Sequence, residues 1–517
     1  MMASVASHPL AALEPRLRNL LPADLYAAAW LDPDRETLVR VFEHLRTLQR
    51  ILYDYVPRQV SERRPSPGEI SHDWQHGTLM FTDLAGFTPL MEINARLGTD
   101  GARSLLLVLN NYFARMIEIV SMSGGTLLEF TGDAMLAQFS ADNRLNDTAQ
   151  AVRAGLRMQR AMEQFGHIAT PQGEVSLGMR IGIHSGRYLT ANIGTPHRMD
   201  HVLLGGDVRT TKHAEGSGYK GRVCLTDAAY ERVRAMFRFD DGEPGYQLVV
   251  DDLEVDELGE YDVAFTRRRL ASAMLFDRSE AGVLREIGGA LEIVEPLASY
   301  LPTPILKLLV ESAAQREITP KFPNVAVIFV NLLGLTEASD RAHGGQEEAL
   351  IAEFSRAFTL INAAVEARGG VLKKVTCHLD GSDTMVYFGV PNAHGDDAMR
   401  AAGAALAIRE IVNSMPPFTV GGQEMTLSCQ IGISYGPVFA GEIGEPRGRR
   451  EYNVLGDTVN TAARLMSSAA LDQVLVNEAV KRQVETVYRC ESLGEVELKG
   501  KSGSLPIYAL SAGEAEA

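Results

Sequence analysis

The chain has 517 residues, of which 45% are hydrophobic and 22% are charged, a globular composition with room for two or three domains. Its net charge of −16 argues against nonspecific binding to nucleic acid or to an anionic membrane. No run approaches the roughly 18 apolar residues of a membrane span, and the four cysteines form no CxxC pair. We therefore expect a cytoplasmic protein with reduced thiols.

Residues 1–75 are expected to form a helical N-terminal region followed by a linker. Apolar residues recur at alternating spacings of three and four from Leu38 to Tyr55, which is typical of a short heptad seam. A Pro-rich run near residue 65 then breaks the pattern. The helix could mediate dimerisation or signalling, or it could pack on the chain's own catalytic core. We favour packing, because a sustained coiled coil needs three or four heptads.

The sequence pattern of residues 76–265 predicts an α+β domain. The expected elements, in chain order, are a strand at 78–83, a helix with its apolar face between residues 105 and 120, a hairpin at 126–139, a helix at 148–165, and strands at 176–183 and 188–193. The order βαββαβ is that of a ferredoxin-like fold, with helices packed on an antiparallel sheet.

The same domain is expected twice. Phe-Thr-Asp-Leu-Ala-Gly-Phe-Thr at residues 81–88 returns at 329–336 as Phe-Val-Asn-Leu-Leu-Gly-Leu-Thr, and Gly-Ile-His-Ser-Gly at 182–186 returns at 432–436. A period this long indicates a domain repeat, because solenoid units run to only about 20 to 50 residues. The second domain covers residues 323–511, and residues 266–322 form a largely helical connector interrupted by prolines, among them Pro296.

Two carboxylates in the first repeat suggest a metal site. Asp83 ends an apolar strand and Asp133 lies in a hairpin turn, so neighbouring strands would bring them side by side. Such a pair can hold two divalent ions. The turn at Gly86, Phe87 and Thr88 opens a helix whose free amides can bind phosphate oxygens.

These segments, together with Gly132–Met135 and Leu455–Leu465, resemble the signature motifs of class III nucleotidyl cyclases. The resemblance implies an intramolecular pseudo-heterodimer of two cyclase domains, two Mg²⁺ or Mn²⁺ ions, and a nucleoside triphosphate, ATP or GTP, as substrate. It also assigns the site residues. Asp83, Asp133 and the Leu84 carbonyl would bind metal, Asn460 would orient the ribose, Arg464 would neutralise charge on the α-phosphate, and Lys499 would reach the terminal phosphates.

The second pocket of such a pair is expected to be degenerate. Asn331 stands at the position of Asp83, and counting back along the hairpin places Ser382 at the position of Asp133. Alignment also puts Arg209 and His213 where the other repeat has Asn460 and Arg464.

Soluble adenylyl cyclases, which the tandem arrangement most resembles, bind bicarbonate in this second pocket through a Lys and an Arg. Arg209 matches that Arg, but Glu129 stands at the position of the Lys. A carboxylate repels an anion, which argues against bicarbonate as the ligand of this pocket. A regulatory role of the pocket stays open.

The choice of base is less well determined by the sequence. Lys374 matches the adenine-contacting Lys of the soluble cyclases, and Asn453 occupies the second base-reading position. Neither position carries the Glu usual for guanine, so ATP is favoured over GTP. An Asn side chain can present either a donor or an acceptor, however, which leaves both bases open. Two alternatives to an adenylate cyclase are a guanylate cyclase and a catalytically silent nucleotide-binding sensor.

Overall fold

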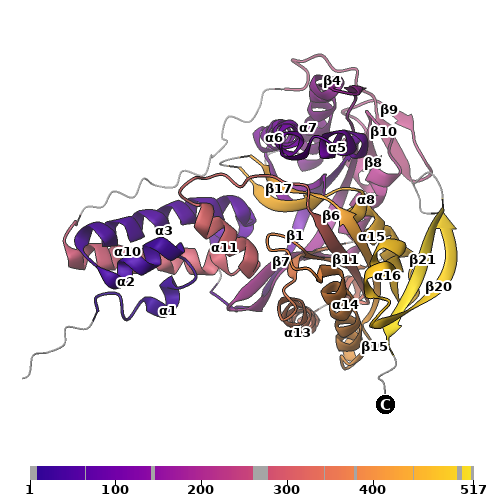
Figure 1. The fold of residues 1–517 in the computed structure, drawn as a ribbon. Coiled ribbons are helices and arrows are strands. Elements are labelled where there is room, and N and C mark those ends of the chain that lie inside the picture. Colours follow the sequence, from indigo (N-terminus) through magenta and orange to yellow (C-terminus); the bar gives the residue numbers. More distant parts are fainter. Residues whose placement is uncertain are drawn as a thin grey trace, which may run out of the picture. The chain divides into compact units, whose positions relative to one another are not determined.

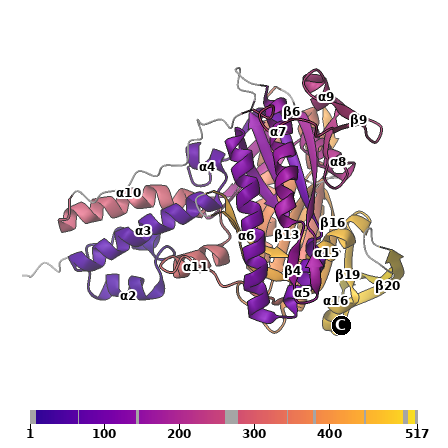
Figure 2. The same ribbon diagram turned by 90° about the horizontal axis from the view of Figure 1, so that it is seen from above.

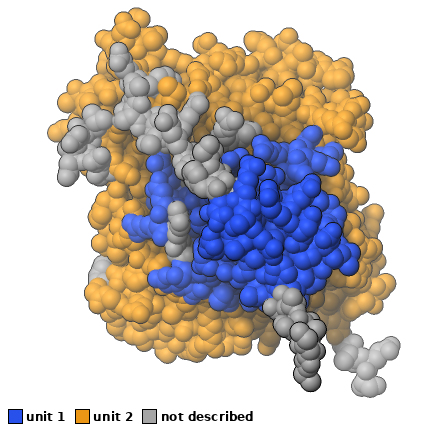
Figure 3. All heavy atoms as spheres, turned by 90° about the vertical axis from the view of Figure 1, so that its left-hand side faces the viewer, with its two compact units in different colours: residues 1–69, 195–199, 266–319 blue, residues 70–194, 200–265, 320–517 orange. Residues whose placement is uncertain are grey.

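The computed structural model describes residues 8–63, 66–140, 146–259, 277–342, 344–377, 381–445, 448–497 and 504–513 (Figures 1 and 2). Its internal contacts divide the chain into two compact units. Unit 1 comprises Met1–Glu69, Thr195–Met199 and Thr266–Thr319, and unit 2 comprises Ile70–Gly194, Asp200–Phe265 and Pro320–Ala517 (Figure 3).

Unit 1 is helical. Its helices are α1 (Glu14–Leu17), α2 (Ala23–Leu31), α3 (Arg35–Tyr55), α4 (Arg58–Arg63), α10 (Glu280–Ala298) and α11 (Thr303–Ser312). Helix α3 begins where the Asp34 side chain accepts a hydrogen bond from the Thr37 amide at 2.8 Å. The seam predicted from Leu38 to Tyr55 is buried, and α3 packs along α10 (Figure 1). Its packing partner within the unit is thus the connector helix of the same chain.

One prediction for the connector was wrong. Pro296 was expected to interrupt the helical stretch, but α10 continues through it to Ala298. A proline removes one backbone donor, and here that loss falls in the last turn of the helix. The proline therefore lies near the helix end instead of dividing the connector.

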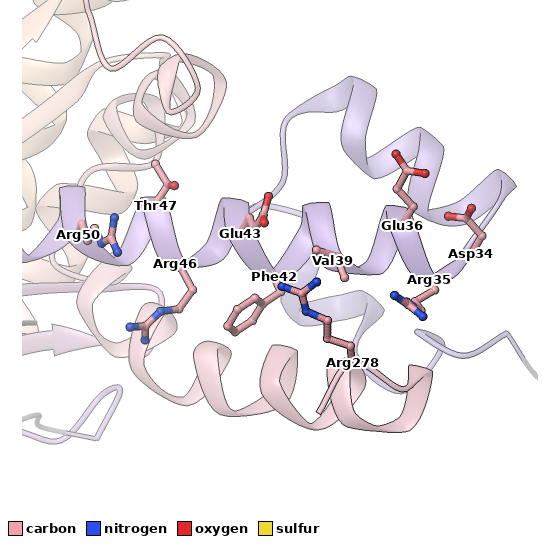
Figure 4. Close-up of a pocket in the computed structure, with 10 residues that line it drawn as sticks. All are labelled: Asp34, Arg35, Glu36, Val39, Phe42, Glu43, Arg46, Thr47, Arg50 and Arg278. Atoms are coloured by element: carbon pink, nitrogen blue, oxygen red, sulfur yellow. The ribbon is translucent and has the colours of Figure 1, made fainter. Parts of the chain in front are cut away.

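Unit 1 also contains a pocket of about 1030 Å³ along α3 and the start of α10. Figure 4 shows Phe42 and Arg46 extending from α3 toward α10. The lining residues are Asp34, Arg35, Glu36, Val39, Phe42, Glu43, Arg46, Thr47, Arg50 and Arg278. Acidic and basic side chains both line this pocket, and none of the motifs that recur in the two repeats contributes a residue to it.

Unit 2 contains two large sheets with the same strand order, which confirms that one α+β domain occurs twice. The first sheet runs β2-β3-β1-β6-β8-β10-β9, with β7 paired to β6, and the second runs β12-β13-β11-β16-β19-β21-β20. The strands of the first sheet are β1 (Ser71–Ala85), β2 (Gly125–Thr131), β3 (Ala134–Ser140), β6 (Gly178–Thr195), β7 (Arg198–Leu204), β8 (Val223–Thr226), β9 (Phe239–Asp241) and β10 (Tyr246–Val249).

The second repeat follows the same plan. Its strands are β11 (Asn324–Leu333), β12 (Val371–Cys377), β13 (Ser382–Phe388), β16 (Ser428–Pro437), β19 (Val474–Asn477), β20 (Tyr488–Glu497) and β21 (Ser504–Ala512). A separate two-stranded ribbon, β17 (Phe439–Gly444) with β18 (Arg450–Leu455), precedes α15 (Asp457–Ser468).

Two details of the predicted sheet were wrong. The strands expected at 176–183 and 188–193 form one strand, β6, because the Ser-Gly pair between them stays in register with β1. The sheets are also mixed, since β6 runs parallel to β8 and β16 runs parallel to β19. A crossover helix joins each of these parallel pairs, α8 (Gly206–Gly216) in the first repeat and α15 in the second.

Paired helices cover one face of each sheet. In the first repeat these are α6 (Gly98–Met122) and α7 (Asp147–Ala161), and in the second they are α13 (Gln346–Glu366) and α14 (Asp397–Asn413) (Figures 1 and 2). Among the described residues, α6 alone is long and apolar enough to cross a membrane. Leu105, Tyr112 and Phe113 of this helix are nevertheless fully buried in the domain core, as in the core helix of a globular domain.

Two glycines of the repeated Gly-Ile-x-x-Gly motif set how closely the crossover helices approach their sheets. A Cβ atom on Gly182 would lie 2.1 Å from the Glu215 backbone nitrogen of α8, and one on Gly432 would lie 2.2 Å from the Met466 nitrogen of α15. Backbone atoms cannot move aside as a flexible side chain can, so a side chain at either position would push the helix away from the sheet. The motif therefore fixes the position of α15, the helix that carries the predicted Asn460 and Arg464.

We predict that Gly432→Ala destabilises unit 2 by about 1–3 kcal/mol, because the added methyl group overpacks the contact between α15 and β16. Gly216→Ala is the matched control, since a Cβ there meets nothing within 4 Å, and its effect should stay within about 0.5 kcal/mol. Urea unfolding of both variants and the parent measures the difference. Equal midpoints for the two variants would contradict this role of Gly432.

Candidate active site

Asp83 and Asp133 lie at the same end of two adjacent strands, β1 and β3, of the first repeat. Strand β1 carries Asp83 near its end, β1 pairs with β3 up to Thr82 opposite Met135, and Asp133 lies in the turn before β3. Gly132 forms this turn at a φ of 68°. Burial and, next, the negative charge of Asp83 raise the pKa of Asp133 to about 7. The two carboxylates are thus close enough to act on each other.

Arg180, which sequence reasoning missed, lies opposite Asp83 on β6. Its Nη2 donates to Asp83 Oδ2 at 2.6 Å, and its Nε lies 2.9 Å from Glu215 Oε1 of α8. The guanidinium thus bridges two acidic side chains. The corresponding residues of the second repeat, Asn331 and Gln430, also lie opposite each other. The sequence shows that the repeats differ at both positions. Only the strand register shows that the two positions are neighbours.

The predicted phosphate turn follows β1 directly. Gly86 has a φ of 92° and precedes α5 (Phe87–Ala95), and no side chain caps this helix end. A Cβ atom on Gly86 would lie 2.5 Å from the Ser176 carbonyl oxygen. The turn therefore needs glycine, and within the part of the chain that the structure describes no side chain caps the first amides of α5, at Phe87 and Thr88. Leu84, whose carbonyl is the further predicted metal ligand, lies between this turn and Asp83.

On the opposite side of the site, Glu451 of β18 gathers three cations. Lys373 and Lys374 each lie 3.4 Å from its carboxylate, and Arg449 lies 3.0 Å away. Burial alone would raise the pKa of Glu451, but Lys374, Lys373 and Arg449 lower it to about 2. Burial lowers the pKa of Lys373 to about 8, against the attraction of Glu451.

A β-bulge explains why two consecutive lysines reach the same carboxylate. The pairing of β12 with β13 shifts between Leu372 and Lys374, so the alternation of side chains is broken at Lys373. The first repeat has a bulge at the same place, where its pairing shifts between Leu127 and Glu129. The sequence predicted Lys374 as a site residue and did not indicate Lys373, because a bulge has no periodic signal.

The two repeats meet at this point. Lys374 Nζ donates to the Phe130 carbonyl oxygen, and Asn453 Nδ2 donates to the Gly132 carbonyl oxygen at 3.1 Å. Phe130 and Gly132 belong to the hairpin that carries Asp133. The predicted base-side residues of the second repeat thus contact the predicted metal-side hairpin of the first.

The remaining predicted residues of this site are on α15 and beyond it. Asn460 is exposed and Arg464 is partly exposed, one turn apart on the same helix. Among the described residues, no hydrogen bond or ion pair holds either side chain, so both can turn toward a ligand. Lys499 lies outside the described residues.

The second pocket has a different polar lining. Buried Asn331 donates from Nδ2 to Gln430 Oε1 at 3.1 Å, where the first repeat has Asp83 with Arg180. Thr82 pairs with Met135 and its counterpart Val330 pairs with Thr384, so the register aligns Ser382, two residues before Thr384, with Asp133.

The strand register also aligns a pair of opposite charges. Glu129 pairs with Leu136, and Lys374 pairs with Met385, the counterpart of Leu136. Glu129 is buried, and it places an acidic side chain at the position that Lys374 occupies in the candidate active site. On α8, Arg209 is partly exposed and His213 is exposed.

Comparison with known proteins gives one family for both repeats. The family model described as "Adenylate and Guanylate cyclase catalytic domain" matches residues 71–248 and 318–512, more than half of the chain. Human "Adenylate cyclase type 10" is 25% identical over 485 residues, 91% of this chain and 28% of its own length. An "Adenylate cyclase" of Mycobacterium tuberculosis is 28% identical over 205 residues, 40% of this chain and 43% of its own length.

The chain thus spans less than half the length of these two relatives. Among solved structures, a "Class III adenylyl cyclase-like ATP-binding protein from Pseudomonas aeruginosa" superposes with a TM-score of 0.54 at 12% identity, covering 86% of this chain and 93% of that one. This likeness supports the fold of both repeats together. The chain belongs to the family of adenylate and guanylate cyclase catalytic domains, of which it carries two copies in tandem.

Proposed function

We propose that the chain is an adenylate cyclase that converts ATP to 3′,5′-cyclic AMP and pyrophosphate at one site between the repeats. The observation that carries this proposal is the contact of Lys374 and Asn453 with the hairpin of Asp133. It supports one site formed by the predicted base-side and metal-side groups, whereas the other pocket has neutral Asn331 and acidic Glu129 at the matching positions. In this proposal the protein is cytoplasmic, where ATP is available.

The residues of the first repeat suit divalent cations. Asp83, Asp133 and the Leu84 carbonyl offer only oxygen ligands, the type that Mg²⁺ and Mn²⁺ prefer. Arg180 already places one positive charge on Asp83, at 2.6 Å. Two bound ions would supply charge neutralisation at the triphosphate and activation of the ribose 3′-hydroxyl.

The chain's own groups would complete the reaction. The α5 amides following Gly86 would bind phosphate oxygens, and Asn460 would orient the ribose so that its 3′-oxygen attacks the α-phosphorus. A new bond from the 3′-oxygen to the α-phosphorus forms as the bond to the pyrophosphate oxygen breaks, and the proton of the 3′-hydroxyl passes to solvent or to the departing pyrophosphate. Arg464 would stabilise the charge of this transition state with its planar donor fork, and Lys499 would hold the leaving pyrophosphate.

Asp83→Asn should lower the formation of cyclic AMP by at least about 100-fold, because it removes the charge that a metal needs. The change keeps the side-chain shape, and the chain already accommodates Asn at the matching position 331. Cyclic AMP and cyclic GMP are measured with Mn²⁺ or Mg²⁺ and either ATP or GTP. Mn²⁺ should raise the melting temperature of the parent and not of the variant.

The alternatives give different results in this assay. A guanylate cyclase would form cyclic GMP preferentially. A silent sensor would bind nucleotide and form no cyclic product under any condition, and that result would overturn the proposed reaction.

Arg464→Ala is expected to reduce kcat by about 100-fold or more with a smaller effect on KM, since charge on the α-phosphate develops mainly in the transition state. Arg482, an exposed arginine that pairs with Glu478 on α16 (Glu478–Val484), provides a control substitution, Arg482→Ala, with kcat unchanged. An equal loss in both variants would remove Arg464 from the proposed reaction.

Restoring one carboxylate should not revive the second pocket. In the double variant Asp83→Asn/Asn331→Asp, the second pocket still has Ser382, Arg209 and His213, so cyclic nucleotide should stay at the level of Asp83→Asn. The carboxylate introduced at position 331 would be buried opposite Gln430 without a cation and should lower the unfolding free energy by about 1–3 kcal/mol. Recovered activity in the double variant would contradict the assignment of a degenerate pocket.

A further inference from the structure

Arg180 links two acidic side chains that come from different elements of the first repeat. Its Nη2 donates to Asp83 Oδ2 of β1 at 2.6 Å, and its Nε lies 2.9 Å from Glu215 Oε1 of α8. Glu215 is buried, so its charge depends on protein partners for neutralisation. The same guanidinium thus pairs with a predicted metal ligand and with a buried carboxylate that no part of the proposed reaction uses.

The backbone fixes the place of Glu215 beside this pair. Arg180 and Gly182 are two residues apart on β6, so they share one face of the sheet. A Cβ atom on Gly182 would lie 2.1 Å from the Glu215 backbone nitrogen, which means that α8 packs directly against this face. Asp83 is the register partner of Arg180 on β1. The three charged side chains therefore form a row across β1, β6 and α8.

The second repeat differs at all three positions of this row. Asn331 and Gln430 are register partners there. Met466 is the counterpart of Glu215, because its backbone nitrogen lies 2.2 Å from the place of a Cβ atom on Gly432. Two amides and a thioether thus replace two carboxylates and a guanidinium. Glu215 is present where the metal carboxylate is present and absent where it is absent, although it lies on α8, outside the strands that carry the predicted metal ligands.

Arg180 and a divalent ion would compete for the Asp83 carboxylate. A guanidinium and a metal ion both use carboxylate oxygens, and two cations at one carboxylate repel each other. Arg180 is itself partly buried, so releasing it from Asp83 without another partner would be costly. Glu215 reduces this cost, because it can hold the guanidinium while Nη2 leaves Asp83.

We propose that Glu215 is a positioning residue of the metal site, which retains Arg180 when the guanidinium leaves Asp83 and so makes Asp83 available to a divalent ion. This inference rests on the proposed function for the presence of a metal, and it does not depend on which nucleotide is the substrate. Among the described residues, Asp83 is the other acidic partner of Arg180. A chain without Glu215 would therefore hold its arginine on Asp83, and an ion would bind there only by displacing it.

The experiment is a double-mutant cycle on Mn²⁺ affinity in the full chain. The variants are Glu215→Met, Arg180→Gln and the two changes together, which copy the residues that the second repeat accommodates at the same positions. Glu231→Met is the control, an exposed glutamate of α9 (Asp227–Val233) that pairs with Arg234. Binding of Mn²⁺ alone is measured by electron paramagnetic resonance of the free ion and by the rise of the melting temperature. If Glu215→Met does not fold, Glu215→Gln, which keeps the side-chain shape, takes its place in the cycle.

Glu215→Met should weaken Mn²⁺ binding about tenfold, within the range of couplings between contacting charged groups. Arg180→Gln should change the affinity by less than about threefold in the parent, where Glu215 can take the arginine, and should raise it about tenfold in the Glu215→Met background. An effect of charge through space alone would give the same ratio in both backgrounds. Glu231→Met should bind Mn²⁺ as the parent does.

Equal effects of Arg180→Gln in the two backgrounds would overturn the inference, as would unchanged Mn²⁺ binding in Glu215→Met or a parent that binds no Mn²⁺. A purely structural role of Glu215 would lower the melting temperature without this coupling, and that result counts against the inference as well. Failure of the proposed function is distinguishable from these outcomes. In that case the parent forms no cyclic nucleotide from ATP or GTP, while the cycle on Mn²⁺ affinity still shows whether Glu215 and Arg180 are coupled.

Discussion

The hydrogen bonds that join β12 and β18 of the second repeat to the β2–β3 hairpin of the first are the constraint on which the site depends. Lys374 and Asn453 donate to carbonyl oxygens of this hairpin, at Phe130 in β2 and at Gly132 in the turn. A substitution does not remove a backbone carbonyl group, so these two acceptors move only if the hairpin itself moves. The position of Asp133 is therefore tied to the position of the base-side residues, and any shift of one repeat against the other would separate both halves of the site.

The cluster around Glu451 lies directly behind this contact. Three cations surround one carboxylate, so the cluster carries an excess of buried positive charge next to a hairpin that carries Asp133. Buried charge of one sign is costly, and a negatively charged group nearby reduces that cost. An ionised carboxylate on the neighbouring hairpin would meet this need. The local charge at this cluster is thus positive, although the chain as a whole carries a net charge of −16.

Much of this arrangement was predictable from the sequence, because it depends on repeated local patterns. The octapeptide with Asp83 predicted the strand end, the turn at Gly86 and the duplication. The contributions of Arg180, Lys373 and Glu451 were not predictable, since they depend on strand register and on a β-bulge. The continuous strand β6 was missed for a related reason. Ser185 and Gly186 are turn-forming residues by type, but pairing with β1 over the whole strand outweighs their local preference.

The same register explains how the two pockets differ without a change of fold. In the first repeat Asp83 faces Arg180, and in the second Asn331 faces Gln430. Arg180 is half-buried and also pairs with Glu215, so losing Asp83 alone would weaken its pairing, and losing Arg180 alone would leave Asp83 without this cation. A change of both to amides keeps one hydrogen bond across the strands, at 3.1 Å, and removes the need for any cation. The second repeat is thus neutral at this pair of positions, where the first repeat carries two opposite charges.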